Sequence, residues 1–525
     1  MIVKSPEKVN PPEAVKSPSK LVLLLTGIFL VCYFVSFWEQ AQTPLWMDEV
    51  LAVWTAQMPS AHDVVSALYH GAEFSPPTYH LLLYALTHAT GHGGYRMLRL
   101  PSILGSMTSG LCIFALVRRY FGVHAAGFGI AFALLSFWSS FALEIRPYAL
   151  VVACFACAVL LWDGLEEHGQ PLWRVGLMAV CLAGAVSLHF YSTLLVACVG
   201  LMEVFWSYTR RRLRLPVWIG LGAAGGSLLI WLPLLRTLSR YNAGDTASPG
   251  YYARPVFDHL LDTYVVLSLA GKRQVLFFAA ALCFVTAAYL RHKSRLPGET
   301  ALEQFPDREK VPATNFYIIA FSAIAYPLLV YCFAVFITKT DNLRYNLVAG
   351  LGFALLAAFL ISRIPAFRRA VPFFLVTACA LAFLRPEPVG VYANVREVNA
   401  VLDHATKPYP IVVSEGLQYF QLEEGLPDSL KSRLVYVTAP EGVASPDPTN
   451  ENQVKRWIPL RPNLKIMDAK TFLARNPRFY LLHTGGTVGI LTNWFLQQGM
   501  LKQPVADLYD IWLFEGESRP DQLPK

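Results

Sequence analysis

Residues 21–37 read LVLLLTGIFLVCYFVSF, a run without a charged side chain. A helix rises 1.5 Å per residue, so an apolar run of about this length can cross the hydrocarbon core of a bilayer. The run has no small-residue cleavage site, and more apolar runs follow it, which predicts an uncleaved first membrane helix. The preceding residues 1–20 are polar and rich in lysine and proline, which predicts a disordered cytoplasmic tail.

Further apolar runs fill most of the chain up to residue 385. Together with the first run they predict a polytopic α-helical membrane protein with about eleven transmembrane helices, forming a transmembrane domain over 21–385. The further runs lie at 98–117, 124–142, 148–162, 173–190, 192–208, 216–235, 274–290, 315–337, 346–362 and 371–385.

The composition agrees with this class. Of 525 residues, 54% are hydrophobic and 15% are charged, whereas a soluble domain carries about 25% charged residues. The net charge of +8 comes from short basic clusters at the ends of apolar runs, as in 210–214. That pattern is typical of membrane-flanking loops, so no nucleic-acid partner is expected. The nine cysteines lie inside apolar runs and indicate no disulfide framework.

The basic clusters also predict an orientation. They lie on the inner side if the N-terminus is cytoplasmic, and an odd number of spans then places the C-terminal region outside. For a bacterial-type plasma (inner) membrane, that side is periplasmic or extracellular. Two long segments are then external, 38–97 and 236–273. The first contains short amphipathic patterns at 52–58, 62–70 and 78–90, and the second contains a helical pattern at 258–269.

From about residue 386 the composition becomes that of a soluble domain. Strand and helix patterns alternate there, which predicts a small α/β domain over 386–525 on the outer face. We identify no motif with chemistry in it. The strands are predicted at 411–414, 434–438, 479–482 and 511–514, and the helices at 395–404, 469–475 and 490–498.

Three groups of charged residues lie at predicted outer boundaries, where charge is costly and often marks a site. The first is Asp48-Glu49, next to a tryptophan in an apolar stretch. One carboxylate can act as a general base on a hydroxyl group, or it can bind a divalent cation. The alternative is a helix start, where acidic residues favour the positive end of the helix dipole.

The second group is Glu144 and Arg146, followed by Pro147 and Tyr148. Proline makes the preceding residue extended, so Glu144 and Arg146 are expected to point to the same side. An arginine at headgroup depth suits a phosphate, and a glutamate suits a sugar hydroxyl or a metal ion. The alternative is an Arg–Glu pair that only neutralises itself.

The third group lies in the short outer turn with Lys339, Arg344 and Tyr345. Two basic residues there contradict the positive-inside tendency, and they either bind a lipid phosphate or anchor the turn among headgroups. His189 and Tyr191, at the outer end of another span, are candidates for lining a cavity.

Four motifs follow one another in order: Leu45-Trp-Met-Asp-Glu49, Ser75-Pro-Pro-Thr-Tyr-His-Leu81, Leu98-Arg-Leu-Pro-Ser102 and Glu144-Ile-Arg-Pro-Tyr-Ala-Leu150. In this order they resemble the membrane glycosyltransferases of the GT-C type, in the branch related to protein O-mannosyltransferases and lipid A aminoarabinose transferases. The resemblance is good over 21–208, looser to 385, and absent as a motif beyond. One departure is Ser75, where the family commonly has a histidine before the two prolines.

The resemblance implies transfer of a sugar, with inversion, from a polyprenyl-phosphate carrier to an acceptor on the outer side. The catalytic acidic residue then maps to Asp48, with Glu49 beside it, and the second acidic site to Glu144. A divalent cation, if one is used, is expected at Asp48 and Glu144. The partners implied are the lipid-linked donor, membrane lipids and the acceptor. The binding residues expected are Arg146, Tyr148, His189, Tyr191, Lys339, Arg344 and Tyr345.

Two other functions fit a polytopic chain. A lipid or polysaccharide transporter or flippase commonly has internal repeats and ionisable groups near the bilayer midplane. Here we find no obvious repeat, and the nearest such group is Glu203. A non-catalytic sensor with an external ligand-binding domain is the third interpretation, and it leaves Asp48, Glu144 and Arg344 without a common purpose.

Overall fold

The computed structural model describes residues 18–91, 94–166, 171–248, 250–269, 271–293, 313–364, 367–386, 395–438, 440, 443, 449–484, 490–508 and 510–518. The predicted tail therefore lies outside the described residues except at its end. Every predicted apolar run is helical over most of its length. These helices are α1 (Pro18–Gln40), α5 (Tyr95–Leu135), α6 (Tyr148–Asp163), α7 (Leu172–Leu188), α8 (Thr193–Arg210), α9 (Leu215–Gly226), α10 (Leu232–Thr246), α12 (Lys272–Lys293), α13 (Thr314–Phe333), α14 (Val348–Ser362) and α15 (Phe367–Ala382).

Helix α5 is two antiparallel helices joined at Gly122. This glycine has φ +84°, a left-handed conformation that interrupts the helix. The halves pack on each other, since a Cβ on Gly110 would lie 3.1 Å from Leu134, and one on Gly129 would lie 3.6 Å from Val117. The two spans predicted at 98–117 and 124–142 are therefore a helical hairpin. The second is shorter than predicted, because η1 (Phe137–Leu143) is a 3₁₀ helix.

Among the described residues, five helical segments, with the α5 hairpin counted as one, are long and apolar enough to cross a membrane, or six if a bent pair, Phe257–Ser268 and Lys272–Phe284, forms one span. Four apolar helices are shorter, so the number of crossings stays a prediction, while a multi-pass membrane protein is confirmed. The five are Ser19–Gln40, Tyr95–Leu135, Phe190–Arg210, Leu215–Thr246 and Thr314–Thr338, and the shorter four are Tyr148–Asp163, Leu172–Leu188, Val348–Ser362 and Ala370–Ala382.

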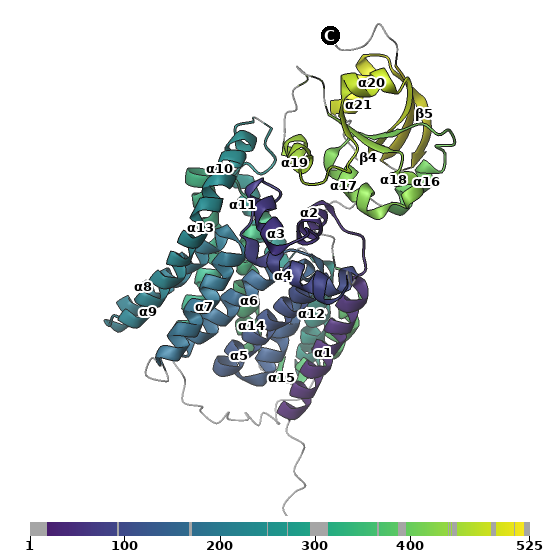
Figure 1. Cartoon of the computed structure of the whole chain (residues 1–525). Helices are drawn as coiled ribbons and strands as arrows, with labels where there is room; N and C mark the ends of the chain where they lie inside the picture. Colours follow the sequence, from purple (N-terminus) through teal and green to yellow (C-terminus); the bar gives the residue numbers. More distant parts are fainter. Residues whose placement is uncertain are drawn as a thin grey trace, which may run out of the picture.

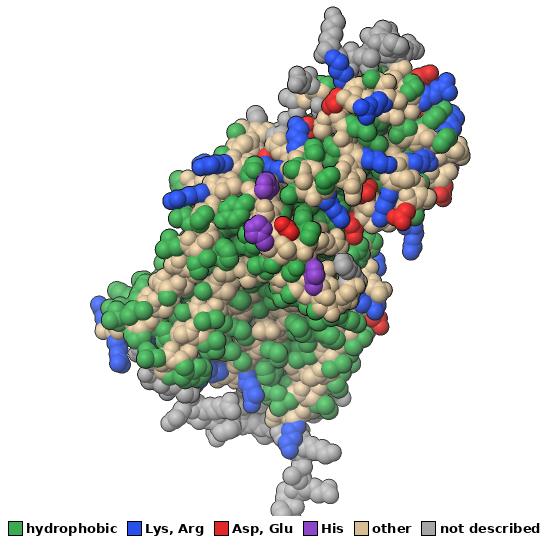
Figure 2. Space-filling view, in the orientation of Figure 1, with side chains coloured by type: hydrophobic (Ala, Val, Ile, Leu, Met, Phe, Trp, Pro, Cys, Tyr) green, Lys and Arg blue, Asp and Glu red, His purple; other side chains and the backbone are tan. Residues whose placement is uncertain are grey.

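The helical bundle has an apolar exterior. Figure 2 shows hydrophobic side chains over most of the bundle, while charged side chains concentrate on the C-terminal domain and near the bundle's ends. Large aliphatic side chains such as Val31, Val180 and Leu229 are more than 60% exposed. Water would penalise such a surface, and lipid hydrocarbon would not.

Short helices cover one end of the bundle. They are α2 (Met47–Ala56), α3 (Ala61–Tyr69) and α4 (Pro77–Ala89), and in Figure 1 they lie between the bundle and the C-terminal domain. The three amphipathic patterns predicted in 38–97 are thus helices. Helix α11 (Phe257–Leu269) agrees with the pattern predicted at 258–269.

The C-terminal domain is α/β, as predicted. Its sheet has the order β3-β2-β1-β4-β6-β5, with β3, β2, β1 and β4 parallel and the last two antiparallel. Strands β3 and β5 were not predicted, because β3 is short and, unlike the buried β1, partly exposed, and β5 contains Pro504, which lowers strand propensity away from a sheet edge. The strands are β1 (Ile411–Val413), β2 (Leu434–Thr438), β3 (Ile466–Asp468), β4 (Arg478–Thr484), β5 (Leu501–Leu508) and β6 (Ile511–Glu517), and the helices are α16 (Val395–Leu402), α17 (Gly416–Gly425), α18 (Asp428–Lys431), α19 (Thr449–Trp457), α20 (Ala469–Arg475) and α21 (Ile490–Gln497).

The C-terminal domain docks on helix α2. The buried ring of Trp54 lies 5.0 Å from Phe420 and 5.4 Å from Trp457, centroid to centroid. Its indole N–H donates to Glu424, at 2.8 Å. Arg461 lies over the same ring, 4.2 Å from its centroid. A large aromatic side chain enclosed in this way is a strong anchor between two surfaces, so the domain is fixed to the helix that carries Asp48.

Candidate active site

Helix α2 begins immediately before the two predicted acidic residues. Trp46 is its N-cap, and the carboxylate of Glu49 accepts the backbone N–H of Trp46 at 3.1 Å. This is half of a capping box, so the interpretation of an acidic helix start holds for Glu49. Successive helical side chains diverge by about 100°. Asp48 and Glu49 therefore enter different surroundings.

Glu49 is completely buried in an ion pair. Arg99 donates to its two oxygens at 3.0 and 2.8 Å. The backbone N–H of Ile145 donates to the same carboxylate at 2.7 Å. Arg99 also donates to the carbonyls of Ala41 and Thr43. These contacts join α2 to α5 and to the loop before α6, which is a structural arrangement.

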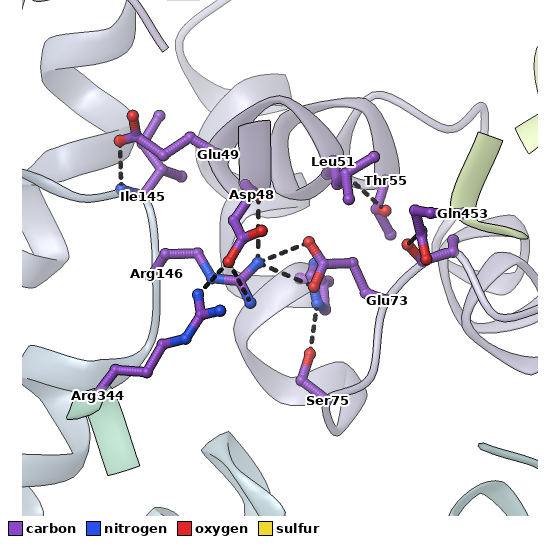
Figure 3. A network of polar contacts seen from close by, with 12 residues as sticks. Asp48, Glu49, Leu51, Thr55, Glu73, Ser75, Ile145, Arg146, Arg344 and Gln453 are labelled. Atoms are coloured by element: carbon purple, nitrogen blue, oxygen red, sulfur yellow. Dashed lines mark hydrogen bonds and ion pairs between the residues drawn. The ribbon is translucent and has the colours of Figure 1, made fainter. Parts of the chain in front are cut away.

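Asp48 lies between two arginines, as Figure 3 shows. Its carboxylate forms an ion pair with Arg344 and lies 4.0 Å from Arg146. Burial opposes ionisation, but the two guanidinium groups outweigh it and hold the pKa of Asp48 below its usual range. The structure thus joins Asp48, Arg146 and Arg344, which sequence analysis selected from three distant segments.

Glu73 completes this network and was missed from the sequence. Both of its oxygens accept from Arg146, at 2.6 and 2.9 Å. Burial raises the pKa of Glu73 to about 7, although Arg146 lowers it. The only signal in the sequence was position, because Glu73 stands two residues before Ser75 and the motif it opens.

Glu144 is not paired with Arg146, so the alternative interpretation, a self-neutralising pair, is wrong. Arg146 has Glu73 and Asp48 as its acidic partners instead. Glu144 is 1% exposed, and neither carboxyl oxygen has a hydrogen-bond partner within the described part of the chain. Burial, together with the charge of Glu49, raises the pKa of Glu144 to about 8. This carboxyl is therefore protonated at neutral pH.

A cavity beside Arg344 collects the predicted aromatic residues. Its volume is about 20 Å³. The rings of Tyr191 and Tyr345 stack at 4.3 Å, His189 lies 5.0 Å from Tyr345, and Tyr148 lies 5.6 Å from His189. Five predicted binding residues thus line one space. Its walls are Tyr148, Val151, Val152, His189, Tyr191, Ser192, Tyr326, Arg344, Tyr345, Leu347 and Val348.

Lys339 does not share this cavity. Its side chain is exposed, and its ammonium group donates to the carbonyl of Val335 one turn earlier. The arrangement fits the alternative interpretation, an anchoring residue outside the site.

Ser75 has an imidazole beside it after all. Its hydroxyl lies 2.8 Å from Nε2 of His80, and both side chains are buried. Burial lowers the pKa of His80 to about 3, and Arg146 adds to this effect. A neutral histidine of the next helix, α4, therefore occupies the space next to the position where the family commonly has histidine. Within the described residues, no group of three or more His, Cys, Asp or Glu side chains is placed to hold a metal ion.

Comparisons with known proteins agree with the resemblance seen in the sequence. Residues 75–236 match the family described as dolichyl-phosphate-mannose-protein mannosyltransferase. The fold is similar to ArnT from Cupriavidus metallidurans bound to undecaprenyl phosphate, with 14% identity, 95% of this chain and 98% of that chain covered, and a TM-score of 0.55. The apo state of ArnT gives 13% identity, the same coverage and the same TM-score. Comparison with curated protein sequences gives no match.

A weaker similarity extends to the archaeal oligosaccharyltransferase AglB from Archaeoglobus fulgidus in complex with an inhibitory peptide and a dolichol-phosphate. It has 11% identity, covers 89% of this chain and 69% of that chain, and has a TM-score of 0.42.

The family match over residues 75–236 and the ArnT-like fold support the predicted membrane glycosyltransferase of the GT-C type. Residues 75–236 are similar to the protein mannosyltransferases, and the fold is similar to that of ArnT, as the motifs predicted. The enzyme interpretation is confirmed over the transporter and sensor alternatives.

Proposed function

We propose that this enzyme transfers a sugar from a polyprenyl-phosphate carrier to an acceptor at the outer face of the plasma membrane, with inversion at the anomeric carbon. The observation that carries the proposal is Asp48 held by Arg344 and Arg146 at the edge of an aromatic cavity. The ArnT structure that the fold resembles is bound to undecaprenyl phosphate, which supports a lipid phosphate as the ligand of the two arginines.

Arg344 and Arg146 bind the carrier phosphate in this proposal. Guanidinium groups suit phosphate because they offer parallel N–H donors. Arg344 lies 5.7 Å from the Trp46 ring and 5.8 Å from the Tyr148 ring, so aromatic faces hold it in place. The sugar then lies next to this cavity, which holds only about one water, and Tyr148, Tyr191 and Tyr345 offer it ring faces and hydroxyl groups.

Asp48 is the base. With no donor bound, its carboxylate is occupied by Arg344, and its low pKa makes it a weak proton acceptor. A phosphate that draws Arg344 away frees the carboxylate and removes the charge that held its pKa down. Donor binding thereby activates the base, which places acceptor activation after donor binding.

The reaction is a single displacement. The acceptor hydroxyl oxygen forms a bond to the anomeric carbon, and the bond from that carbon to the phosphate oxygen breaks. The hydroxyl proton goes to Asp48, and the electron pair leaves with the polyprenyl phosphate. The extra negative charge on the phosphate is stabilised by Arg344 and Arg146, which is commonly the larger contribution in such reactions.

The other three carboxyl groups support these residues. Glu73 orients Arg146 through two hydrogen bonds, and Glu49 fixes the start of α2 through Arg99. Glu144, protonated at neutral pH, can donate a hydrogen bond to a sugar hydroxyl or phosphate oxygen. If a divalent cation takes part, Asp48 and Glu144 are the residues that we expect to hold it.

Mass spectrometry of co-purifying lipids tests the donor assignment. We expect wild-type protein in detergent to retain a polyprenyl-phosphate sugar, and Arg344→Ala to retain at least tenfold less. Lys339→Ala is the matched control, because this exposed cation lies five residues earlier in the same outer turn, and it should retain as much as wild type. Equal loss in both variants, or only bulk phospholipid in all three samples, would contradict the assignment.

A further inference from the structure

One hydrogen bond joins the C-terminal domain to the active-site network. The side-chain amide of Gln453, on α19, donates to the carbonyl of Ala72 at 2.7 Å. Ala72 directly precedes Glu73, which holds Arg146. Figure 3 shows Gln453 at one side of this network, near Glu73. A residue 381 positions away in sequence thus contacts the backbone beside an active-site carboxylate.

Gln453 is itself held in place. Arg456, one turn later on α19, donates to the side-chain oxygen of Gln453 at 3.2 Å and to Asp245 of α10 at 3.0 Å. Asn452 donates to the other oxygen of Asp245 at 2.8 Å. The polar chain therefore runs from α10 through α19 to Ala72.

The segment that carries Glu73 is enclosed by the same residues. The guanidinium of Arg456 lies 5.0 Å from the ring centroids of both Phe74 and Tyr241. Gly71 has φ +78°, and a Cβ there would lie 3.1 Å from Arg456. Residues 71–74 belong to neither α3 nor α4. Their position thus depends on α19 and α10 in addition to their own backbone.

We propose that the C-terminal domain is part of the catalytic apparatus, with Gln453 as a positioning residue that holds Glu73, and through it Arg146, in register with Asp48. The inference rests on the proposed function, since it assigns Arg146 to the carrier phosphate. Displacements of about 1 Å in a catalytic arrangement can lower rates by about a hundredfold. A hydrogen bond that fixes an irregular segment beside a catalytic carboxylate is therefore of kinetic importance.

A double-mutant cycle tests the proposal. The full-length chain is assayed for polyprenyl phosphate release from a polyprenyl-phosphate sugar, in native membranes that contain the acceptor. Gln453→Met removes the side-chain N–H group that donates to Ala72, without adding charge. If this variant does not fold, Gln453→Glu, which has nearly the same volume and also lacks that N–H group, is used in its place. We expect either to slow turnover about tenfold to a hundredfold. Lys455→Met, an exposed change on the same helix, should leave turnover unchanged.

The decisive comparison measures the effect of Gln453→Met in a chain that already carries Glu73→Gln. If Gln453 acts through Glu73, Gln453→Met should cause less than a twofold further loss there, because the two effects are not additive. If the fold-losses in turnover of the two single variants multiply in the double variant, the proposal is overturned. It is also overturned if Gln453→Met turns over like wild type while Glu73→Gln is slow. Wild-type turnover of Glu73→Gln itself would instead contradict the role given to Glu73 in the proposed function.

Discussion

Asp48 and Glu49 are neighbours in sequence with opposite surroundings. Asp48 has two arginines that a phosphate can recruit, while Glu49 is saturated by Arg99 and two backbone N–H groups. Composition and spacing identify both as unusual carboxylates in an apolar stretch, yet they cannot assign the roles. Those follow from the helix start at Trp46, which directs one side chain toward the cavity and the other into the protein.

Glu144 should make stability depend on pH. The native state keeps this carboxyl protonated up to about pH 8, whereas the unfolded chain ionises near 4.5. Its burial therefore lowers stability as pH rises from 4.5 to 8, by on the order of 3 kcal/mol at pH 7. Glu144→Gln removes this dependence. We expect the variant to unfold at a higher temperature than wild type at pH 8 in detergent, with the difference vanishing near pH 4.5.

A difference between the two proteins that stayed constant between pH 4.5 and 8 would contradict a raised pKa.

At the scale of the elements, the apolar runs predict the helices well because length and hydropathy alone decide them. Even the reversal inside α5 followed from the basic pair Arg118-Arg119, close to Gly122. Glu73 could not be predicted, because its burial depends on Arg146 and on the contact with α19, and neither leaves a local pattern. Strand β5 was missed because of a misleading local pattern, since Pro504 lies within what is an edge strand.

Glu203 lies in a buried contact between helices. It pairs with Arg214 and accepts the indole N–H of Trp162, and both charged side chains are completely buried. Arg214 also lies 3.7 Å from the ring centroid of Trp206. Glu203, the nearest exception to charge-free helix centres, thus serves to join α8 to the start of α9.

Helix α2 should depend on its buried ion pair. Glu49→Gln leaves the guanidinium of Arg99 buried without its charge partner, which costs about 3–5 kcal/mol. We expect the unfolding temperature in detergent to fall strongly, with loss of activity as a consequence. Asp428→Asn, on a fully exposed side chain, is the control and should unfold like wild type. Normal stability of Glu49→Gln with lost turnover would instead assign Glu49 to the chemistry.

At the scale of the whole molecule, the proposal requires the active site and the C-terminal domain on the outer side. Helices α2 to α4 lie between the bundle and that domain (Figure 1), so both share one side of the bundle. The exposed bases at 210–212 lie at the C-terminal end of α8, where the positive-inside rule places the cytoplasm.

Cysteine labelling tests this orientation. A membrane-impermeant maleimide should label Asp428→Cys in intact cells, and Arg212→Cys only after permeabilisation. The wild-type chain is the control, because its free cysteines at the described positions lie within apolar helices. Labelling of position 212 in intact cells would reverse the orientation and place the site on the wrong side for the proposed transfer.

In the proposed mechanism, Asp48 takes the acceptor proton while Arg344 and Arg146 hold the leaving phosphate. The most direct measurement compares wild type with Asp48→Asn for polyprenyl phosphate release in acceptor-containing membranes, with donor retention followed by mass spectrometry. We expect turnover to fall by about 10²–10⁴-fold, while the variant retains at least as much donor as wild type. Unchanged turnover by a variant that retains its donor would show that Asp48 is not the base.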